Sequence, residues 1–237
     1  MYFTGKVWRK VNQQIIRILN SIPSVKRGRI VVALSGGMDS VFLLIALTQL
    51  EKKYKFKLLP VHINHGIQQE AKLFEKIAQH ISRELGYECQ TFPIRKRPKG
   101  KNLEEWLREE RYRLLENYRK KLKADFVAVA HHASDQAETV LAHIIRGSGL
   151  RGLQGMLPVR GRIIRPLLDC TKKDIKILME KSNFSYYNDK LNYSLIYQRN
   201  KIRHRLIPFL EKEFNPKITD RLAKLAKIAQ KYFKDTK

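Results

Sequence analysis

The sequence has little cysteine and no long apolar run. Its 237 residues contain two cysteines, Cys89 and Cys170, which are too few and too far apart for a disulfide framework or a zinc site. The longest continuous apolar run, residues 41–47, is far shorter than the ~18 residues that a membrane-spanning helix needs. The N-terminal sequence MYFTGKVWRKVNQQ lacks the apolar segment of a secretory signal. We therefore expect a cytoplasmic protein with no membrane segment.

Acidic residues are also scarce. The chain has 22 Asp and Glu against 48 Lys and Arg, a net charge of +26, which is typical of proteins that bind polyanions. The 43% of hydrophobic residues excludes a disordered tail. Cations gather in residues 95–101, where proline and glycine favour a surface loop, and in residues 199–205, where an amphipathic helix would cluster the arginines. Either run could be only a solvated face, the first more readily. RNA is the leading partner, and an acidic membrane surface is second.

Short apolar runs alternate with helix-like segments. The runs predict buried strands at residues 30–34, 56–63, 87–94 and 126–130. The segments after them predict helices at residues 41–50, 68–85, 103–122 and 134–145. This spacing indicates right-handed βαβ units, so we predict an α/β protein with a doubly wound parallel sheet. Residues 162–168 are a further strand candidate, and Thr171 is placed to cap a helix over residues 171–181.

A small helical extension is predicted at the C-terminal end. Residues 217–234 form an amphipathic pattern whose apolar face holds Ile218, Leu222, Leu225, Ile228 and Tyr232. A lone helix cannot bury such a face. It docks on the main domain, pairs with a second copy in a homodimer, or is the remainder of something absent.

The segment between the first strand and its helix reads Ser35-Gly36-Gly37-Met38-Asp39-Ser40. Two glycines let the backbone approach a ligand closely, and the first N–H groups of the helix point at that ligand. Such a cradle at the carboxyl end of a strand suits a phosphate group. A plain strand-to-helix turn capped by serine is the alternative. Neither GxxxxGK[ST] nor GxGxxG is present.

This segment resembles the SGGxDS signature of the PP-loop ATP pyrophosphatases. The resemblance implies an adenine nucleotide alpha hydrolase-like fold in which residues 35–40 bind ATP. These enzymes cleave ATP between its α- and β-phosphates and adenylate a carbonyl oxygen, which activates the carbon for attack by a nucleophile.

Further motifs resemble those of the tRNA(Ile)-lysidine synthetase family in order and spacing. They are VHINHG at 61–66, ERY at 110–112, AHHASDQAET at 130–139, RGSGLRGL at 146–153, RPLL at 165–168 and YQRNKIRHRLIP at 197–208. The resemblance covers roughly residues 28–215. It implies a ligase of tRNA processing that attaches L-lysine to C2 of the wobble cytidine in an isoleucine tRNA with a CAU anticodon. ATP is then a co-substrate and Mg²⁺ a cofactor.

The resemblance also implies a division of the chain. It has an N-terminal helix (1–27), a PP-loop nucleotide-binding catalytic domain (28–168), a helical tRNA-contacting extension (169–215) and a C-terminal amphipathic helix (216–237). Many members of the family carry further C-terminal domains that help to grip the tRNA.

Catalytic roles are expected for three carboxylates and one arginine. Asp135 and Glu138 are three apart, which places them on one face of a helix beginning near Ser134. Asp39 and Asp135 are the expected Mg²⁺ ligands, because Mg²⁺ prefers oxygen, and Asp135 is also a candidate general base. Arg111 resembles an arginine that the family places near the substrate. Alternatively, the acids only complement helix dipoles, His131 and His132 only fix the strand end, and Arg111 is a solvated cation.

Contacts to tRNA are expected from Arg146, Arg151, Arg199, Asn200, Arg203, His204 and Arg205. Arginine offers forked donors to phosphate and stacks on unpaired bases. A tRNA thiolase is the alternative enzyme, disfavoured because the two cysteines stand alone. A non-catalytic RNA-binding protein of the same fold is the other alternative, which the intact residues 35–40 disfavour.

Overall fold

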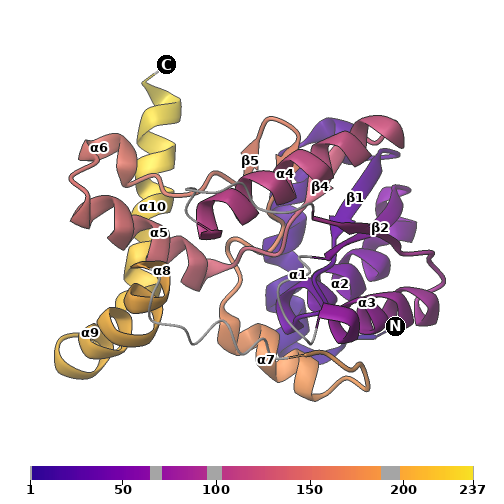
Figure 1. Ribbon diagram of the computed structural model, residues 1–237. Coiled ribbons are helices and arrows are strands. Elements are labelled where there is room, and N and C mark those ends of the chain that lie inside the picture. The colour runs from indigo at the N-terminus through magenta and orange to yellow at the C-terminus, as the bar shows by residue number, and fades with distance from the viewer. Residues whose placement is uncertain (1, 65–70, 95–102, 188–197, 237) are drawn as a thin grey trace.

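A six-stranded sheet forms the centre of the computed structural model, which describes residues 2–64, 71–94, 103–187 and 198–236. The strands lie in the order β3-β2-β1-β4-β6-β5; Figure 1 labels β2, β1, β4 and β5 of this sheet. Their bounds are β1 Arg29–Ala33, β2 Lys57–Asn64, β3 Gln90–Pro93, β4 Phe126–Ala128, β5 Val159–Arg160 and β6 Ile163–Ile164. β1 is parallel to both β2 and β4, and β6 is parallel to β4. The predicted doubly wound parallel α/β fold is confirmed.

The far edge of the sheet differs from the prediction. Residues 162–168 were a strand candidate, and of these only Ile163–Ile164 form a strand, paired antiparallel with Val159–Arg160 in a short hairpin. Gly161 turns this hairpin with a positive φ of 59°, a conformation that glycine adopts at no steric cost. The chain after β6 instead leads toward the functional site.

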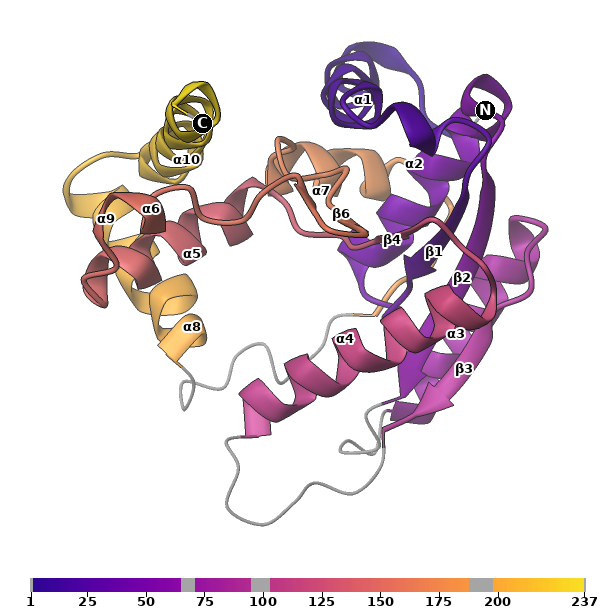
Figure 2. The same cartoon turned by 90° about the horizontal axis from the view of Figure 1, so that it is seen from above.

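Helices cover both faces of the sheet. Ile30 and Val32 of β1 face a large core shared with α1 (Gly5–Asn20), α2 (Met38–Tyr54), α3 (Ala71–Glu84) and α7 (Lys172–Glu180). Val31 points the other way, toward Leu115 of α4 (Leu103–Lys121), because successive side chains of a strand alternate between faces. Figure 2 shows α4 across the sheet from α1 and α2.

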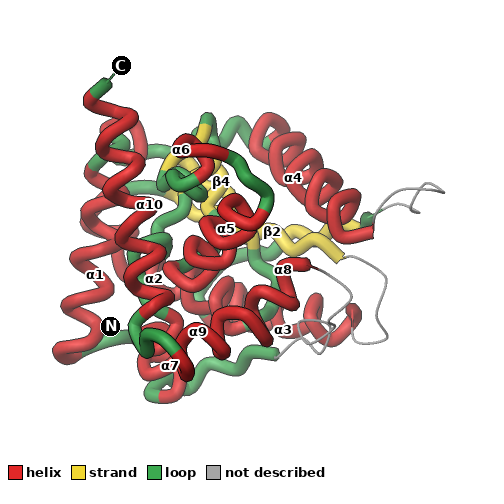
Figure 3. The backbone as a smooth tube through the Cα atoms, turned by 90° about the vertical axis from the view of Figure 1, so that its left-hand side faces the viewer, coloured by secondary structure: helices red, strands yellow, loops and turns green. Residues whose placement is uncertain are grey.

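A second, smaller core lies beside the sheet domain. It joins α5 (Ala133–Ile145) to the C-terminal helices, and its buried residues include Val140, Ile202, Ile207 and Leu222. The other helices of this group are α6 (Gly149–Gly152), α8 (Gln198–Lys201), α9 (Ile207–Glu213), α10 (Ile218–Asp235) and a π-helical turn, η3 (Ile202–Leu206). Figure 3 shows α10 running alongside α5. The predicted C-terminal helical extension is therefore present.

The apolar face of α10 is only partly covered. Leu222 and Ala226 are buried against α5, whereas Leu225, Ile228 and Tyr232 stay exposed. The helix thus docks on the rest of the chain, which was the first of the three expected arrangements. A homodimer that covers the remainder stays a prediction. No helix within the described residues is long and apolar enough to span a membrane.

The basic run at 199–205 was expected to lie in one amphipathic helix. Instead it begins in α8, a single α-helical turn, and continues into the π-turn η3. Pro208 lacks the N–H that would bond the carbonyl of residue 204, and this favours a local departure from α-helical bonding. Such π-turns occur frequently at functional sites.

Candidate active site at the switch point of the sheet

The candidate site lies where the strand order reverses. β1 is hydrogen-bonded to β2 on one side and to β4 on the other, with Val32 opposite both Pro60 and Ala128. The loops that leave β1 and β4 at their carboxyl ends therefore start side by side. In open α/β sheets ligands bind at this switch point. The two loops lead into α2 and α5, which carry most of the expected catalytic residues.

The loop after β1 is held by its own serines. Ser40 Oγ donates to the carbonyl of Gly37 at 2.9 Å and accepts from the N–H of Ser35 at 3.1 Å. The hydroxyls of Ser35 and Ser40 lie 3.0 Å apart. Gly36 has a φ of 84°, and a Cβ there would lie 2.8 Å from the carbonyl oxygen of Phe74, so only glycine fits. The result is a preformed turn at the N-terminus of α2.

Asp39, in the first turn of α2, faces the second loop. Its Oδ2 lies 3.6 Å from Nε2 of His132 and 3.5 Å from Nζ of Lys172. Burial favours the neutral carboxyl, but the hydrogen bond and charge of His132 and the charge of Lys172 prevail and lower the pKa of Asp39. Oδ1 of Asp39 is buried and has no hydrogen-bond partner among the described residues. A buried, ionised oxygen of this kind is suited to a cation.

His132 joins the two loops. It is 2% exposed and caps α5 by accepting the N–H of Ser134 at Nδ1, while Asp135 accepts the N–H of His132 in return. In the neutral ring the accepting Nδ1 leaves the proton on Nε2, which faces Asp39. Burial opposes the imidazolium, but Asp135 and Asp39 outweigh it and raise the pKa of His132.

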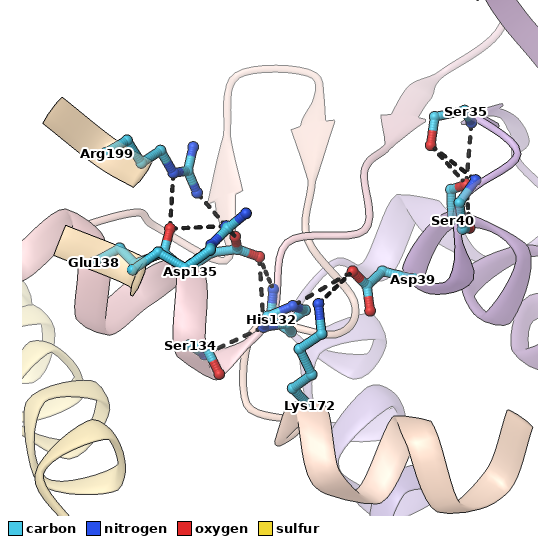
Figure 4. A network of polar contacts seen from close by, with 11 residues as sticks. Ser35, Asp39, Ser40, His132, Ser134, Asp135, Glu138, Lys172 and Arg199 are labelled. Atoms are coloured by element: carbon cyan, nitrogen blue, oxygen red, sulfur yellow. Dashed lines mark hydrogen bonds and ion pairs between the residues drawn. The ribbon is translucent and has the colours of Figure 1, made fainter. Parts of the chain in front are cut away.

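Asp135 and Glu138 of α5 hold two arginines from the C-terminal helices. Arg199 donates from Nε to Glu138 at 2.8 Å and from Nη2 to Asp135 at 2.9 Å. Arg203 donates to the same pair, at 2.6 Å to Glu138 and 3.0 Å to Asp135. Figure 4 shows a continuous chain of polar contacts from Arg199 through Asp135 and His132 to Asp39 and Lys172.

The cations around Asp135 keep it ionised. Burial alone would raise the pKa of this carboxyl, yet the charges of His132, Arg199 and Arg203 together lower it far below its ordinary value. A carboxylate this acidic is a weak proton acceptor at neutral pH, because a general base works best with a pKa near the working pH. Asp135 is better suited to act as a fixed negative charge.

Two further arginines, Arg165 and Arg111, lie near His131. Arg165 is 5% exposed and donates to Nδ1 of His131 at 3.3 Å and to the carbonyl of Leu157 at 2.7 Å. Burial, reinforced by Arg199, Arg165 and Arg111, lowers the pKa of His131 to about 3, so its ring is neutral. Burial and nearby arginines also lower the pKa of Arg111, which lies against the ring of Tyr112 at 5.7 Å.

The residues expected to contact tRNA differ in how far their side chains are exposed to solvent. Arg146, Arg151 and Arg205 are exposed, whereas Asn200 and His204 are half-buried in the C-terminal helices. Arg199 and Arg203 are the ones bound to carboxylates, with 32% and 28% of their side chains exposed. The exposed arginines are therefore available to a large anion, while Arg199 and Arg203 are already paired.

Sequence reasoning missed Lys172 and Arg165 as site residues. Lys172 reaches Asp39 across 133 positions of sequence, and no local pattern marks it. Arg165 lies in the RPLL motif that was noted without assigning it a role. Arg165 stands out as a site residue because it is almost completely buried, and this burial cannot be predicted from the sequence. No cluster of three or more His, Cys, Asp or Glu within the described residues is arranged to hold a metal ion alone.

A protein-family model described as the PP-loop domain matches residues 8–210. This match includes the turn at residues 35–40 and the whole sheet. The chain belongs to the PP-loop family.

Curated relatives of this PP-loop chain are tRNA(Ile)-lysidine synthases. The enzyme from Clostridium perfringens is 36% identical over 223 residues, which are 91% of this chain and 48% of the relative. The one from Thermosipho africanus is 39% identical over 192 residues, covering 79% of this chain and 45% of the relative. The chain thus spans about half the length of the curated relatives it matches.

Solved structures support the PP-loop fold. A U34-tRNA thiolase from Methanococcus maripaludis, solved with its [4Fe-4S] cluster, superimposes with a TM-score of 0.78 at 19% identity, covering 94% of this chain and 80% of the thiolase. An NH3-dependent NAD synthetase from Campylobacter jejuni has a TM-score of 0.52 at 18% identity, covering 94% and 95% of the two chains. At these identities the likeness concerns the fold alone.

Proposed function

We propose that this PP-loop chain ligates L-lysine to C2 of the wobble cytidine of an isoleucine tRNA with a CAU anticodon, at the expense of ATP. The observation that carries the proposal is the placement of the SGGMDS turn beside the carboxylate–arginine cluster, in a chain 36% identical to a tRNA(Ile)-lysidine synthase. This cluster consists of Asp135, Glu138, Arg199 and Arg203. Lysine, the CAU anticodon and the adenylated intermediate belong to this proposal.

The first step is activation of the base by ATP. The triphosphate lies on the turn of residues 35–40, where Gly36 and Gly37 give close backbone approach and the first N–H groups of α2 face the phosphates. The C2 carbonyl oxygen of cytosine attacks the α-phosphate and pyrophosphate leaves. Its charge is stabilised by the loop N–H groups, which are in place before the reaction begins.

Mg²⁺ fits this site through Asp39. The orphan Oδ1 of Asp39 is buried and belongs to a carboxylate with a lowered pKa, which suits a hard cation that prefers oxygen. Asp135 was the second expected ligand, but it lies on the far side of the His132 ring from Asp39 and is occupied by arginines. We therefore assign Mg²⁺ to Asp39, where it would neutralise charge on the phosphates.

In the second step the ε-amine of lysine attacks C2, the bond from C2 to the phosphate oxygen breaks as AMP leaves, and the proton lost by the nitrogen passes to solvent, which yields lysidine. Asp135 and Glu138 supply fixed negative charge to this step, and Asp135 is too acidic to be its main proton acceptor. Arg111 and Arg165 lie near His131, and their charge complements the negative charge of the tRNA backbone and of the leaving AMP. Arg146, Arg151 and Arg205 are exposed and contact tRNA phosphates.

Incubation with ATP, Mg²⁺, radiolabelled lysine and bulk tRNA tests the reaction. Label should enter tRNA only when ATP is present, because the adenylate must form before lysine attacks. Label that appears without ATP, or never appears with any tRNA, contradicts the proposal. Radiolabelled arginine is the matched control, and it should not be incorporated.

The thiolase alternative would give a product that gains sulfur. Its sulfur would need a reactive thiol, yet burial raises the pKa of Cys89 to about 11 and raises that of Cys170 further. Both cysteines are free thiols that pack with the main core. A non-catalytic RNA-binding protein would release no pyrophosphate from ATP when tRNA is added.

A further inference from the structure

A short strap of the chain, residues 182–187, runs from the end of α7 to the nucleotide turn. The N–H of Tyr187 donates to the carbonyl of Gly36 at 3.0 Å, and Tyr187 forms an isolated parallel β-bridge with Gly37. Phe184 and Tyr186 alternate with an exposed residue and pack against the main core. The strap is therefore anchored on the sheet domain before it reaches the turn.

The ring of Tyr187 packs against a residue of α3. It meets the ring of Phe74 edge-to-face, with the ring centroids 4.6 Å apart. Phe74 lies in the first turn of α3, and its carbonyl oxygen leaves no room for a Cβ on Gly36. The glycine turn is thus bracketed by α3 and by the strap, two segments far apart in sequence.

This bracket sets the direction of one N–H group. In a trans peptide the C=O and the following N–H point in opposite directions. Because the carbonyl of Gly36 is fixed on Tyr187, the N–H of Gly37 points away from the strap, toward Ser35 Oγ at 3.4 Å. A glycine pair without this anchor would sample several orientations, and ordering them on binding would cost conformational entropy.

We propose that Tyr187 is a positioning residue for the nucleotide site. Its backbone fixes the Gly36–Gly37 peptide, and its ring, seated on Phe74, fixes the strap, so that the turn is shaped for the phosphates of a nucleoside triphosphate before the ligand arrives. The role rests on the nucleotide-binding part of the proposed function and not on lysine transfer.

Affinity for an ATP analogue with an α,β-methylene bridge, measured by calorimetry with Mg²⁺, tests this role. Tyr187→Ala keeps the backbone N–H but loses the ring, and should weaken the affinity by about 2- to 10-fold, the worth of one aromatic pair. Tyr187→Pro removes the N–H and should weaken it by at least about the same factor. Tyr187→Phe keeps ring and N–H and should bind like the wild type.

Turnover separates positioning from general damage to the fold. For Tyr187→Ala the KM for ATP should rise while kcat at saturating ATP and the affinity for tRNA stay near wild type. In a double-mutant cycle, Phe74→Ala should add little to Tyr187→Ala, since both remove the same contact. If Tyr187→Ala does not fold, Tyr187→Leu keeps most of the volume without the ring and takes its place.

The outcomes distinguish this role from the proposed reaction. Unchanged analogue affinity in the ring-less variant and in Tyr187→Pro, at wild-type melting temperature, overturns the role of Tyr187. A wild-type chain that binds the analogue but never transfers lysine overturns the proposed reaction, and the affinities still decide the role of Tyr187.

Discussion

The nucleotide turn and the carboxylate–arginine cluster lie at neighbouring strand ends but are held together differently. The serine hydrogen bonds of the turn are neutral and local, since Ser35 and Ser40 bond to each other and to the backbone within six consecutive residues. The turn also contains the charged Asp39 and accepts a long-range backbone hydrogen bond from Tyr187. The cluster is charged and long-range, since Arg199 reaches Glu138 across 61 positions and Arg203 reaches Asp135 across 68. His132, between Asp39 and Asp135, connects them.

This difference indicates what each region offers a ligand. The turn presents backbone donors and one orphan carboxylate oxygen, so an anion with its cation can bind there without displacing a protein contact. In the cluster every described charge is already paired, so a ligand must share or replace ion pairs whose loss is costly when buried. We infer that the turn binds the nucleotide, whereas the carboxylate–arginine cluster positions the groups that react.

The largest effect is expected from Asp135→Asn. The amide is nearly isosteric and its oxygen still accepts from Arg199 and Arg203, but the negative charge and the acceptor for the N–H of His132 are lost. Lysidine formation should fall by about 10²–10³-fold, the range for losing one positioned electrostatic group, while the affinity for tRNA changes little. Steady-state rates with labelled lysine measure this. Asp220→Asn, an exposed first-turn acid of α10, is the matched control and should remain active. Normal turnover of Asp135→Asn would move the essential carboxylate to Asp39 or Glu138.

Gly36→Ala should disrupt the nucleotide turn without altering the carboxylate–arginine cluster. A Cβ would meet the carbonyl oxygen of Phe74 at 2.8 Å on a backbone with φ of 84°, so the turn must move and its donors with it. Activity should fall by about 10²-fold, in the range seen when one positioned donor is lost. Gly161→Ala, also at positive φ but in open space, serves as the control. Wild-type affinity for ATP in Gly36→Ala would show that the turn is not the phosphate site.

Local and long-range contacts also differ in how well the sequence predicts them. The turn at 35–40, the strands and the common face of Asp135 and Glu138 depend on neighbouring residues, and local pattern was enough for them. The pairing of Asp39 with Lys172 and the sorting of arginines into paired and exposed depend on tertiary packing. The hairpin at 159–164 depends on tertiary packing as well, because its short apolar pattern is compatible with one longer strand or with two short ones.

Salt dependence should separate exposed from paired arginines. Arg205→Ala should reduce the slope of log affinity for tRNA against log salt by about 0.7–0.9, the value of one phosphate contact. Arg203→Ala should change this slope less and lower turnover more, because Arg203 is held by Glu138. Filter binding at several salt concentrations measures both. Equal slopes for both variants and the wild type would show that the basic residues at 199–205 are only a solvated face that does not contact tRNA phosphates.

The smallest effect concerns pH and stability. His131 has a pKa of about 3 in the folded chain against an ordinary value of 6.5, so the unfolded chain binds more protons between these limits. The contribution of His131 to the free energy of unfolding should therefore fall as pH drops below about 6.5. His131→Asn keeps an acceptor for Arg165 and should make the melting temperature less dependent on pH between about 7 and 5. His80→Asn, at an exposed position, should not.

Nucleoside mass analysis tests the central claim most directly. An isoleucine tRNA transcript with a CAU anticodon, incubated with ATP, Mg²⁺ and lysine, should yield a wobble cytidine whose mass has grown by lysine less one water. A transcript with guanosine at the wobble position should stay unchanged. A wobble nucleoside that gains sulfur, or one that stays unmodified while the chain binds both ATP and tRNA, would contradict the account.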